Sequence, residues 1–208
     1  DAVRAGGDAA VRELTLRFDG VDVATTRVPD EVLAAAPAAV AAEVRTALEV
    51  AAAGIEDFHR HQVRAPSRYE RDGIVVEGRA QPVDRAGCYV PGGRALYPST
   101  VLMTAIPALV AGVPEVVLCV PPGPDGEVPQ LTLAAAAVAG VSEVHRVGGA
   151  QAVAALAYGT GSIPAVDVIV GPGNVYVAEA KRQVAGEGRV GVPSAFAGPS
   201  EVVVVADA

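Results

Sequence analysis

The sequence predicts an α/β fold: a mostly parallel sheet with helices on both faces, preceded by an N-terminal helical segment. Two observations predict it. From residue 83 onward, short apolar runs of strand length alternate with short helical segments, the pattern of parallel strands joined by crossover helices. Three of these runs also end in glycine turns that lead into helices. Sheets of this kind bind ligands at the carboxyl ends of their strands.

The composition is that of a folded, soluble protein. The chain has 208 residues, of which 51% are hydrophobic and 19% charged, enough to bury one large domain or two small ones. A net charge of −8 without any basic cluster argues against a nucleic-acid partner. No apolar stretch reaches the ~18 residues of a membrane span, and no signal peptide is visible. We therefore expect neither nucleic acid nor membrane as a partner.

The two cysteines predict a cytoplasmic protein. Cys88 and Cys119 each lie inside an apolar run that is typical of a buried strand. We therefore expect two reduced core side chains rather than a disulfide, as in a reducing compartment.

The N-terminal part of the chain is predicted to be helical. Apolar side chains recur at helical spacing over residues 1–18, and Asp19-Gly20 ends this segment. A second helical region opens near residue 29 and continues to about residue 62, with a break expected at Pro37. Near its end His59 and His61 are two positions apart, so they point to different faces of a helix and make a poor metal pair.

Residue 82 is the expected boundary between this segment and the α/β part. Residues 1–82 form the N-terminal helical segment, in which a strand pair starts near residue 73. Strands are predicted over 73–78, before the boundary, and over 83–90, after it. Residues 83–200 form the α/β domain, and residues 201–208 the first strand of a further portion. Within 83–200 we expect helices over 100–111, 131–139, 150–158 and 175–185, and strands over 115–120, 143–147 and 166–170.

The glycine turns predict a ligand-binding crevice. They follow Val90, Val147 and Val170 and occupy residues 91–93, 148–151 and 171–174. In a parallel sheet all three would lie on one edge, where free N–H groups at helix starts favour anions and polar ligand atoms. This composition is typical of a site for a dinucleotide or another phosphate-bearing ligand. Neither G-x-G-x-x-G nor the P-loop motif is present, so those motifs lend no support.

Each candidate side chain also has a structural interpretation. Gln151 and Asn174 stand at the lip of the expected crevice, but either could instead cap its helix. Tyr89 could be a core tyrosine with its hydroxyl satisfied at the sheet edge. Ser200, which precedes the last predicted strand, could hold a substrate group or simply form a turn. The residues alone leave these alternatives open.

Five motifs resemble the successive signatures of the histidinol dehydrogenase family, in the same order and at similar spacing. They are GCYVPGGRALYPSTVLM at 87–103, VGGAQAVAA at 147–155, GPGN at 171–174, EAKRQV at 179–184 and AGPSEV at 197–202. The resemblance covers nearly the whole chain and is densest from residue 83 onward. Several motifs in order are far more specific than one glycine turn.

The resemblance implies a zinc-dependent, NAD-linked homodimeric enzyme of histidine biosynthesis. Such an enzyme oxidises L-histidinol through L-histidinaldehyde to L-histidine in two hydride transfers, and its two α/β domains are arranged as in aldehyde dehydrogenases, each an incomplete Rossmann fold. Matched residue by residue, Tyr89, Gln151 and Asn174 correspond to positions that contact NAD, and Ser200 to a serine that touches the substrate. NAD rather than NADP follows from the resemblance alone, since the sequence places no acidic residue on the ribose.

The resemblance also implies a reaction centre that lies outside this chain. The family's zinc-binding Gln and His, its Glu-His acid–base pair and its later Asp and His ligands would all follow Ala208, so we expect a chain truncated at both ends, without catalytic or metal-binding residues. Two alternatives remain open. One is a related dehydrogenase for another alcohol, like sulfopropanediol dehydrogenase, and the other is a non-catalytic nucleotide-binding or dimerisation module. The sequence beyond residue 208 would distinguish them.

Residues 1–208 alone are predicted to show no turnover with histidinol and to hold zinc only weakly. His145 lies in a predicted strand with a packing role, so the three histidines and two cysteines do not converge on the crevice. Loss of the acid–base pair alone lowers a rate by roughly 10²–10⁴-fold. NADH formation by the purified fragment, with added zinc and saturating histidinol, is the measurement. Zinc-dependent turnover above a blank would place the reaction centre within these residues.

Overall fold

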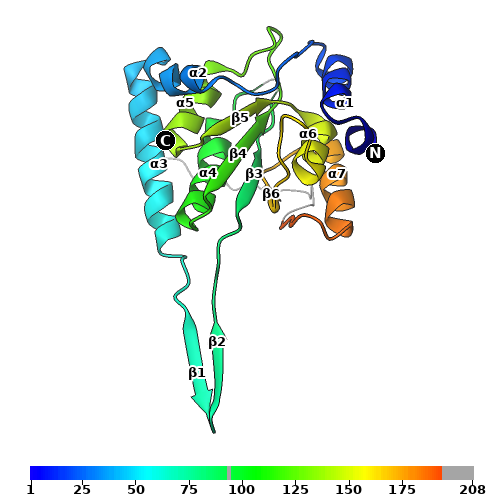
Figure 1. Ribbon diagram of the computed structural model, residues 1–208. Coiled ribbons are helices and arrows are strands. Elements are labelled where there is room, and N and C mark those ends of the chain that lie inside the picture. Colours follow the sequence, from blue (N-terminus) through cyan, green and yellow to red (C-terminus); the bar gives the residue numbers. More distant parts are fainter. Residues whose placement is uncertain (93–94, 194–208) are drawn as a thin grey trace, which may run out of the picture.

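The computed structural model describes residues 1–92 and 95–193, and a four-stranded parallel sheet lies at its centre (Figure 1). The strands are β3 (Arg85–Tyr89), β4 (Glu115–Val120), β5 (Glu143–Arg146) and β6 (Val168–Val170). Their order is β5-β4-β3-β6, and each neighbouring pair is parallel. All four carboxyl ends therefore lie on the same edge, and the predicted α/β class is confirmed.

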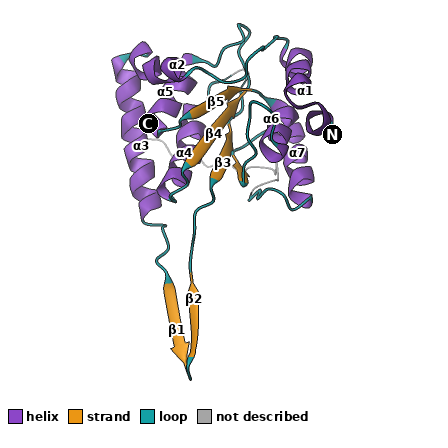
Figure 2. Cartoon of the chain, in the orientation of Figure 1, coloured by secondary structure: helices purple, strands orange, loops and turns teal. Residues whose placement is uncertain are grey.

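Helices cover both faces of this sheet, so the molecule has three layers (Figure 2). On one face lie α3 (Ala42–Arg60), α4 (Pro98–Val110) and α5 (Gln130–Ala139), and on the other α1 (Ala2–Asp19), α6 (Gly149–Tyr158) and α7 (Val175–Gly186). Side chains alternate along the strands and fill one apolar core on each side. Leu118 belongs to the core beneath α4 and α5, whereas its neighbour Val117 belongs to the core beneath α6.

The two cysteines lie on neighbouring strands but on opposite faces. Cys88 of β3 packs in the core beneath α4, and Cys119 of β4 packs in the core beneath α6. Both are free and fully buried. Burial raises the pKa of the Cys88 thiol to about 12, so it stays protonated and behaves as a small apolar side chain. The prediction of two buried, unpaired cysteines is confirmed.

The N-terminal helices follow the sequence prediction. α1 ends where Gly20 adopts a left-handed conformation with φ of 76° and donates its N–H to the Leu16 carbonyl, a helix stop that favours glycine. The predicted break at Pro37 is also present. α2 (Asp30–Ala35) passes into the 3₁₀ turn η1 (Ala36–Ala39) before α3 begins, because a proline inside a helix removes a hydrogen bond and clashes with the preceding turn.

The helices before residue 61 contribute to the cores on both faces of the sheet. Leu33 and Leu48, from α2 and α3, belong to the same core as the residues of β3 and β4. Val11 of α1 belongs to the core on the other face. The predicted domain boundary near residue 82 stays a prediction. The described helices before it belong to the two helical layers that cover the sheet.

The sequence prediction missed one strand and gave the strand over residues 73–78 the wrong partner. The strand predicted over 73–78 is β2 (Ile74–Gly78), but it pairs antiparallel with β1 (Ser67–Arg71) in a separate hairpin. This hairpin projects away from the three layers (Figure 1). β1 reads SRYER and has a single apolar side chain, too weak an alternation to indicate a strand. Asp72-Gly73, with φ of 52° and 79°, is the two-residue turn that could have indicated it.

The strand predicted within residues 201–208 lies outside the described residues. Among the helices of the described parts of the chain, none has both the length and the apolar character needed to cross a membrane.

Charged side chains gather at the amino edge of the sheet, opposite the glycine turns. Arg85, Glu115 and Glu143 are the first residues of β3, β4 and β5. Arg85 is 8% exposed, and its guanidinium donates to Glu115 Oε2 at 2.5 Å and to Glu143 Oε2 at 2.7 Å. His145 Nε2 lies 2.7 Å from Glu143 Oε1, and its Nδ1 lies 3.0 Å from Thr26 Oγ1. This network connects three strands to the segment that follows α1.

The network predicts acid sensitivity through Glu143. Burial alone would raise the pKa of this carboxyl, but hydrogen bonds from His145 and Arg85 outweigh it and lower the pKa to about 2. A pKa that is lower in the folded than in the unfolded state adds stability above the unfolded value, and this stability is lost as the pH falls toward the folded value. We therefore expect the free energy of unfolding to decrease between about pH 4.5 and pH 2, and Glu143→Gln to decrease less.

Urea unfolding at pH values across this window is the measurement. Glu49→Gln, which alters an exposed glutamate of α3, is the matched control and should keep the pH dependence of the unaltered protein. Equal pH dependence in Glu143→Gln and the unaltered protein would contradict the role of this carboxylate.

Candidate functional site

The predicted crevice is present at the carboxyl edge of the sheet as a pocket of about 1020 Å³. This volume is at the upper end of ligand pockets, large enough for a dinucleotide. All three glycine turns contribute to its wall or border it. The lining includes Pro91 and Gly92 from the turn after β3, Gly149 and Gln151 from the turn after β5, and Asn174 from the turn after β6. Gly93, the last residue of the first turn, lies outside the described residues.

Tyr89 is the last residue of β3 and reaches the pocket from the sheet. Its side chain is 3% exposed, and its hydroxyl accepts a hydrogen bond of 3.1 Å from the backbone N–H of Gly149. Burial raises the pKa of this hydroxyl, so it stays protonated and can still donate to a ligand. Tyr89 is therefore both a buried core side chain and part of the pocket wall, two positions that the sequence presented as alternatives.

Gln151 is not a helix cap. The cap position of α6 is Gly148, and no side chain caps that helix. Gln151 lies inside the first turn of α6, is 4% exposed and lines the pocket. Its carboxamide packs against Gly149, where φ is +62° and an added Cβ would lie 2.6 Å from Gln151 Oε1. Glycine is therefore favoured at 149 by its left-handed backbone conformation.

Asn174 is both a helix cap and a wall of the pocket. Its Oδ1 accepts hydrogen bonds from the N–H groups of Tyr176 at 3.1 Å and Val177 at 3.0 Å, at the start of α7. Capping uses only the oxygen of the carboxamide, so the two N–H donors of its amide remain for other partners. An amide donor next to a helix N-terminus suits an anionic or carbonyl-bearing ligand.

The turn after β6 is held in place from two sides. Gly171 has φ of +103°, and a Cβ there would overlap the carbonyl oxygen of Tyr89. From the opposite side Lys181 of α7 donates from its ammonium to the Gly171 carbonyl. Lys181 is 2% exposed, and burial lowers its pKa. These contacts fix the position of Asn174 relative to Tyr89.

The sequence prediction missed several residues of the pocket, among them two polar or aromatic side chains of α1. Phe18 and Asp19, at the C-terminal end of α1, line the pocket beside Tyr89 and Gln151. The Asp19 carboxylate lies 3.4 Å from Gln151 Nε2, and burial raises its pKa. In the sequence Asp19 appears only as the end of a helix, and no motif links it to turns more than seventy residues away. Only the packing of α1 on α6 brings it to the crevice.

The described residues do not form a metal centre. Within residues 1–92 and 95–193, no three His, Cys, Asp or Glu side chains gather in a way that could hold a metal ion. His59 contacts Gln62, His61 contacts the Asp57 carbonyl, and His145 is buried in the network at the opposite edge. None of the three lines the crevice. A zinc ion does not fit these described residues.

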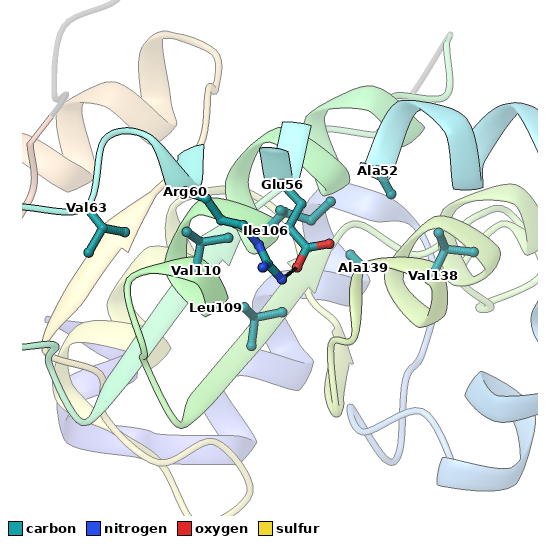
Figure 3. A pocket seen from close by; sticks show the side chains of 9 residues that line it. All are labelled: Ala52, Glu56, Arg60, Val63, Ile106, Leu109, Val110, Val138 and Ala139. Atoms are coloured by element: carbon teal, nitrogen blue, oxygen red, sulfur yellow. Dashed lines mark hydrogen bonds and ion pairs between the residues drawn. The ribbon is translucent and has the colours of Figure 1, made fainter. Parts of the chain in front are cut away.

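A second hollow lies between α3, α4 and α5 (Figure 3). Its volume is about 450 Å³, and its wall is apolar except for Glu56 and Arg60, which pair with each other at 2.5 Å. Leu109 and Ala139 come from the last turns of α4 and α5. Helices that follow parallel strands run back toward the amino edge, so this hollow lies far from the glycine turns. Without convergent polar groups it is the weaker candidate for a ligand site.

The sequence model of the family described as "Histidinol dehydrogenase" matches residues 1–208. The chain belongs to the histidinol dehydrogenase family. It is 53% identical over 206 residues to histidinol dehydrogenase from Methanothermobacter thermautotrophicus, covering 99% of this chain and 48% of that protein. It is 55% identical over 210 residues to the enzyme from Pseudomonas aeruginosa, covering 99% of this chain and 47% of that protein.

A solved structure agrees with this family. The crystal structure of histidinol dehydrogenase from Elizabethkingia anophelis superimposes with a TM-score of 0.89 at 37% identity, covering 95% of this chain and 46% of that one. The resemblance read from the five motifs is therefore confirmed. The chain spans about half the length of the relatives it matches, which is consistent with the expected truncation. Ser200 lies outside the described residues, and its role stays a prediction.

The contact between Gly171 and Tyr89 predicts that Gly171→Ala destabilises the protein. A side chain there needs a left-handed φ and overlaps a backbone carbonyl, so we expect a loss of at least about 2 kcal/mol in the free energy of unfolding. Gly54→Ala, in α3 where an added Cβ meets open space, is the matched control and should stabilise slightly. Chemical denaturation measures both. Equal stability of the two variants would show that the turn accommodates a side chain.

Proposed function

We propose that the whole protein is an NAD-dependent histidinol dehydrogenase, which oxidises L-histidinol through L-histidinaldehyde to L-histidine in histidine biosynthesis. The observation that carries this proposal is the match of the family over the whole chain, together with the crevice at the predicted edge of the sheet. This chain contributes the cofactor crevice. The zinc ligands and the acid–base residues belong to the part of the relatives that this chain does not span.

The described residues fit a nicotinamide dinucleotide. Two helix N-termini, those of α6 and α7, face one pocket whose size suits a dinucleotide, and backbone N–H groups at such positions bind phosphate. Gly149 leaves the room next to Gln151 that a Cβ would fill. When bound, NAD would supply the hydride acceptor of the reaction.

We assign three side chains of this chain to the cofactor. Tyr89 offers a protonated hydroxyl, Gln151 a buried carboxamide and Asn174 two amide donors. Each lines the same pocket, and together they orient the dinucleotide and exclude water from it. Ser200 is assigned to the substrate by the resemblance alone. We infer a cytoplasmic location from the biosynthetic role and from the two free, buried cysteines.

An assay of the whole protein tests the activity. With L-histidinol, NAD and zinc we expect about two NADH for each histidinol consumed, because the proposed oxidation has two hydride transfers. NADH formation from sulfopropanediol and not from histidinol would favour the related dehydrogenase instead. Failure to form NADH with either alcohol would contradict the proposed function.

Asn174→Ala in the whole protein is expected to weaken NAD binding about tenfold and histidinol binding far less. The loss corresponds to one hydrogen bond to the ligand plus a weaker start of α7. Titrations of both ligands measure the difference. Asn174→Asp is the matched control for capping, because it keeps the acceptor oxygen but loses the amide donors. Unchanged NAD affinity in both variants would remove Asn174 from the site.

We propose a homodimer in which the hairpin of β1 and β2 contacts the second copy. Tyr69, Ile74 and Val76 lie on one face of this hairpin and are 57%, 65% and 56% exposed. The opposite face carries Arg68 and its ion pairs with Glu70 and Glu77, interrupted by Val75. An isolated two-stranded ribbon is at best marginally stable in water, so its apolar face needs a cover.

Val76→Asp is therefore expected to shift the whole protein from dimer to monomer, because it buries a charge in the proposed interface. Val75→Asp changes the neighbouring residue on the charged face and should leave the dimer intact. Analytical ultracentrifugation over a range of protein concentrations measures the dissociation constant of each variant. A dimer of the same affinity in both variants would exclude this face of the hairpin.

A further inference from the structure

We propose that Lys181, which does not line the crevice, is a positioning residue for the dinucleotide. Its ammonium holds the turn 171–174 against Tyr89 and thereby orients the Asn174 amide toward the cofactor. This inference rests on the proposed function, and it adds a residue that acts on cofactor binding through the backbone. It also gives a role to EAKRQV at 179–184, a motif of the family resemblance that contributes no residue to the pocket wall.

Lys181 is the only lysine among the 16 lysine and arginine residues of the chain. Within 179–184, all of which the structure describes, it is also the one buried polar residue. Glu179 and Arg182 of the same motif pair with each other at the surface. A lysine carries its charge on a slim, flexible stem, whereas an arginine ends in a broad planar fork. A lysine therefore suits a narrow position inside the core better than an arginine does.

An ammonium at this place is unfavourable for the fold. Val177, Lys181 and Val184 follow one another on one face of α7 and are 0%, 2% and 4% exposed. Both valines belong to the core beneath α6. Burial disfavours the charged form of an amine and lowers the pKa of Lys181, and an apolar side chain would continue the stripe without this cost. A polar group at such an apolar position points to a functional requirement.

The hydrogen bond that Lys181 makes shows what the ammonium does. Side chains of a helix tilt toward its N-terminus, and Lys181 lies about 10 Å along the axis of α7 from Asn174. Its stem reaches back toward the start of the helix, where the ammonium donates to the Gly171 carbonyl. The turn is thus tied to α7 at two points, by this bond and by the Asn174 cap.

The turn needs this second attachment because of its glycines. Gly171 and Gly173 allow many backbone conformations, yet Gly171 must adopt φ of +103° and lie so close to Tyr89 that a Cβ would overlap the Tyr89 carbonyl oxygen. The Asn174 amide keeps its place in the pocket wall only while the turn stays there. Lys181 therefore fixes Asn174 relative to Tyr89 before the cofactor arrives, which lowers the ordering cost of binding.

Calorimetric titration of the whole protein with NAD and with L-histidinol tests this role. Lys181→Met keeps a flexible stem in the core but has no donor for the Gly171 carbonyl. We expect NAD to bind about tenfold more weakly, as for one lost hydrogen bond, and histidinol to bind as in the unaltered protein. The matched control is Val184→Ala, which removes apolar atoms from the same buried face one turn farther along α7. It should lower stability but leave the NAD affinity unchanged.

A double-mutant cycle separates positioning from a general structural role. Asn174→Ala removes the amide that Lys181 is proposed to orient, so Lys181→Met should cost less than about threefold further NAD affinity in that background. Independent losses of about tenfold each would instead multiply to about a hundredfold. Lys181→Gln, whose shorter side chain does not reach the same carbonyl, should weaken NAD in the same way. It replaces Lys181→Met in both experiments if that variant fails to fold, as judged by circular dichroism.

The outcomes separate the proposed function from this inference. An unaltered protein that binds no NAD would overturn both. If the unaltered protein binds NAD, an unchanged NAD affinity in the Lys181 variant would overturn this inference alone. The same conclusion would follow from equal weakening of NAD and histidinol, from equal weakening of NAD by Val184→Ala, or from a hundredfold loss in the double variant. An unchanged NAD affinity in Asn174→Ala would remove the group that Lys181 is proposed to orient and would also overturn it.

Discussion

Each strand of the main sheet runs parallel to its neighbours, and the site depends on this constraint. In the order β5-β4-β3-β6 the chain leaves every strand at the same edge, so the turns after β3, β5 and β6 meet there although they are separated by about sixty and twenty residues in sequence. The hydrogen bond from Gly149 to the Tyr89 hydroxyl and the packing of Gly171 on the Tyr89 backbone join these turns. Tyr89 is thus the residue around which the crevice is assembled.

The two edges of the sheet differ in how their polar side chains are paired. At the amino edge Arg85 and Glu143 pair with each other in a buried network, and the adjoining hairpin carries exposed apolar side chains. At the carboxyl edge the polar groups of Asp19, Gln151 and Asn174 surround a large pocket. Buried polar groups that pair with each other join the elements of a fold, whereas polar groups with spare capacity around a cavity are available to a ligand. This contrast favours the carboxyl edge as the ligand-binding edge.

The pocket is built from more of the chain than its motifs suggest. The glycine turns all lie beyond residue 90, yet α1 contributes Phe18 and Asp19 to the wall. α1 is therefore part of the pocket as well as of the core beneath α6. A relative with the same motifs but a different end of α1 would have a different wall at this point.

The sequence by itself determined the local features. Alternating apolar runs and glycine turns predicted the strands, the helices and the edge that carries Tyr89, Gln151 and Asn174, because period, turn chemistry and capping are encoded by neighbouring residues. Tertiary structure alone decided the arrival of Asp19 beside Gln151, because Asp19 reads in the sequence only as a helix end. The pairing of β1 with β2 has one local signal, the Asp72-Gly73 turn, but SRYER scarcely alternates, so the apolar pattern does not indicate β1. Contacts between distant segments depend on how whole helices pack, which the pattern of one segment does not contain.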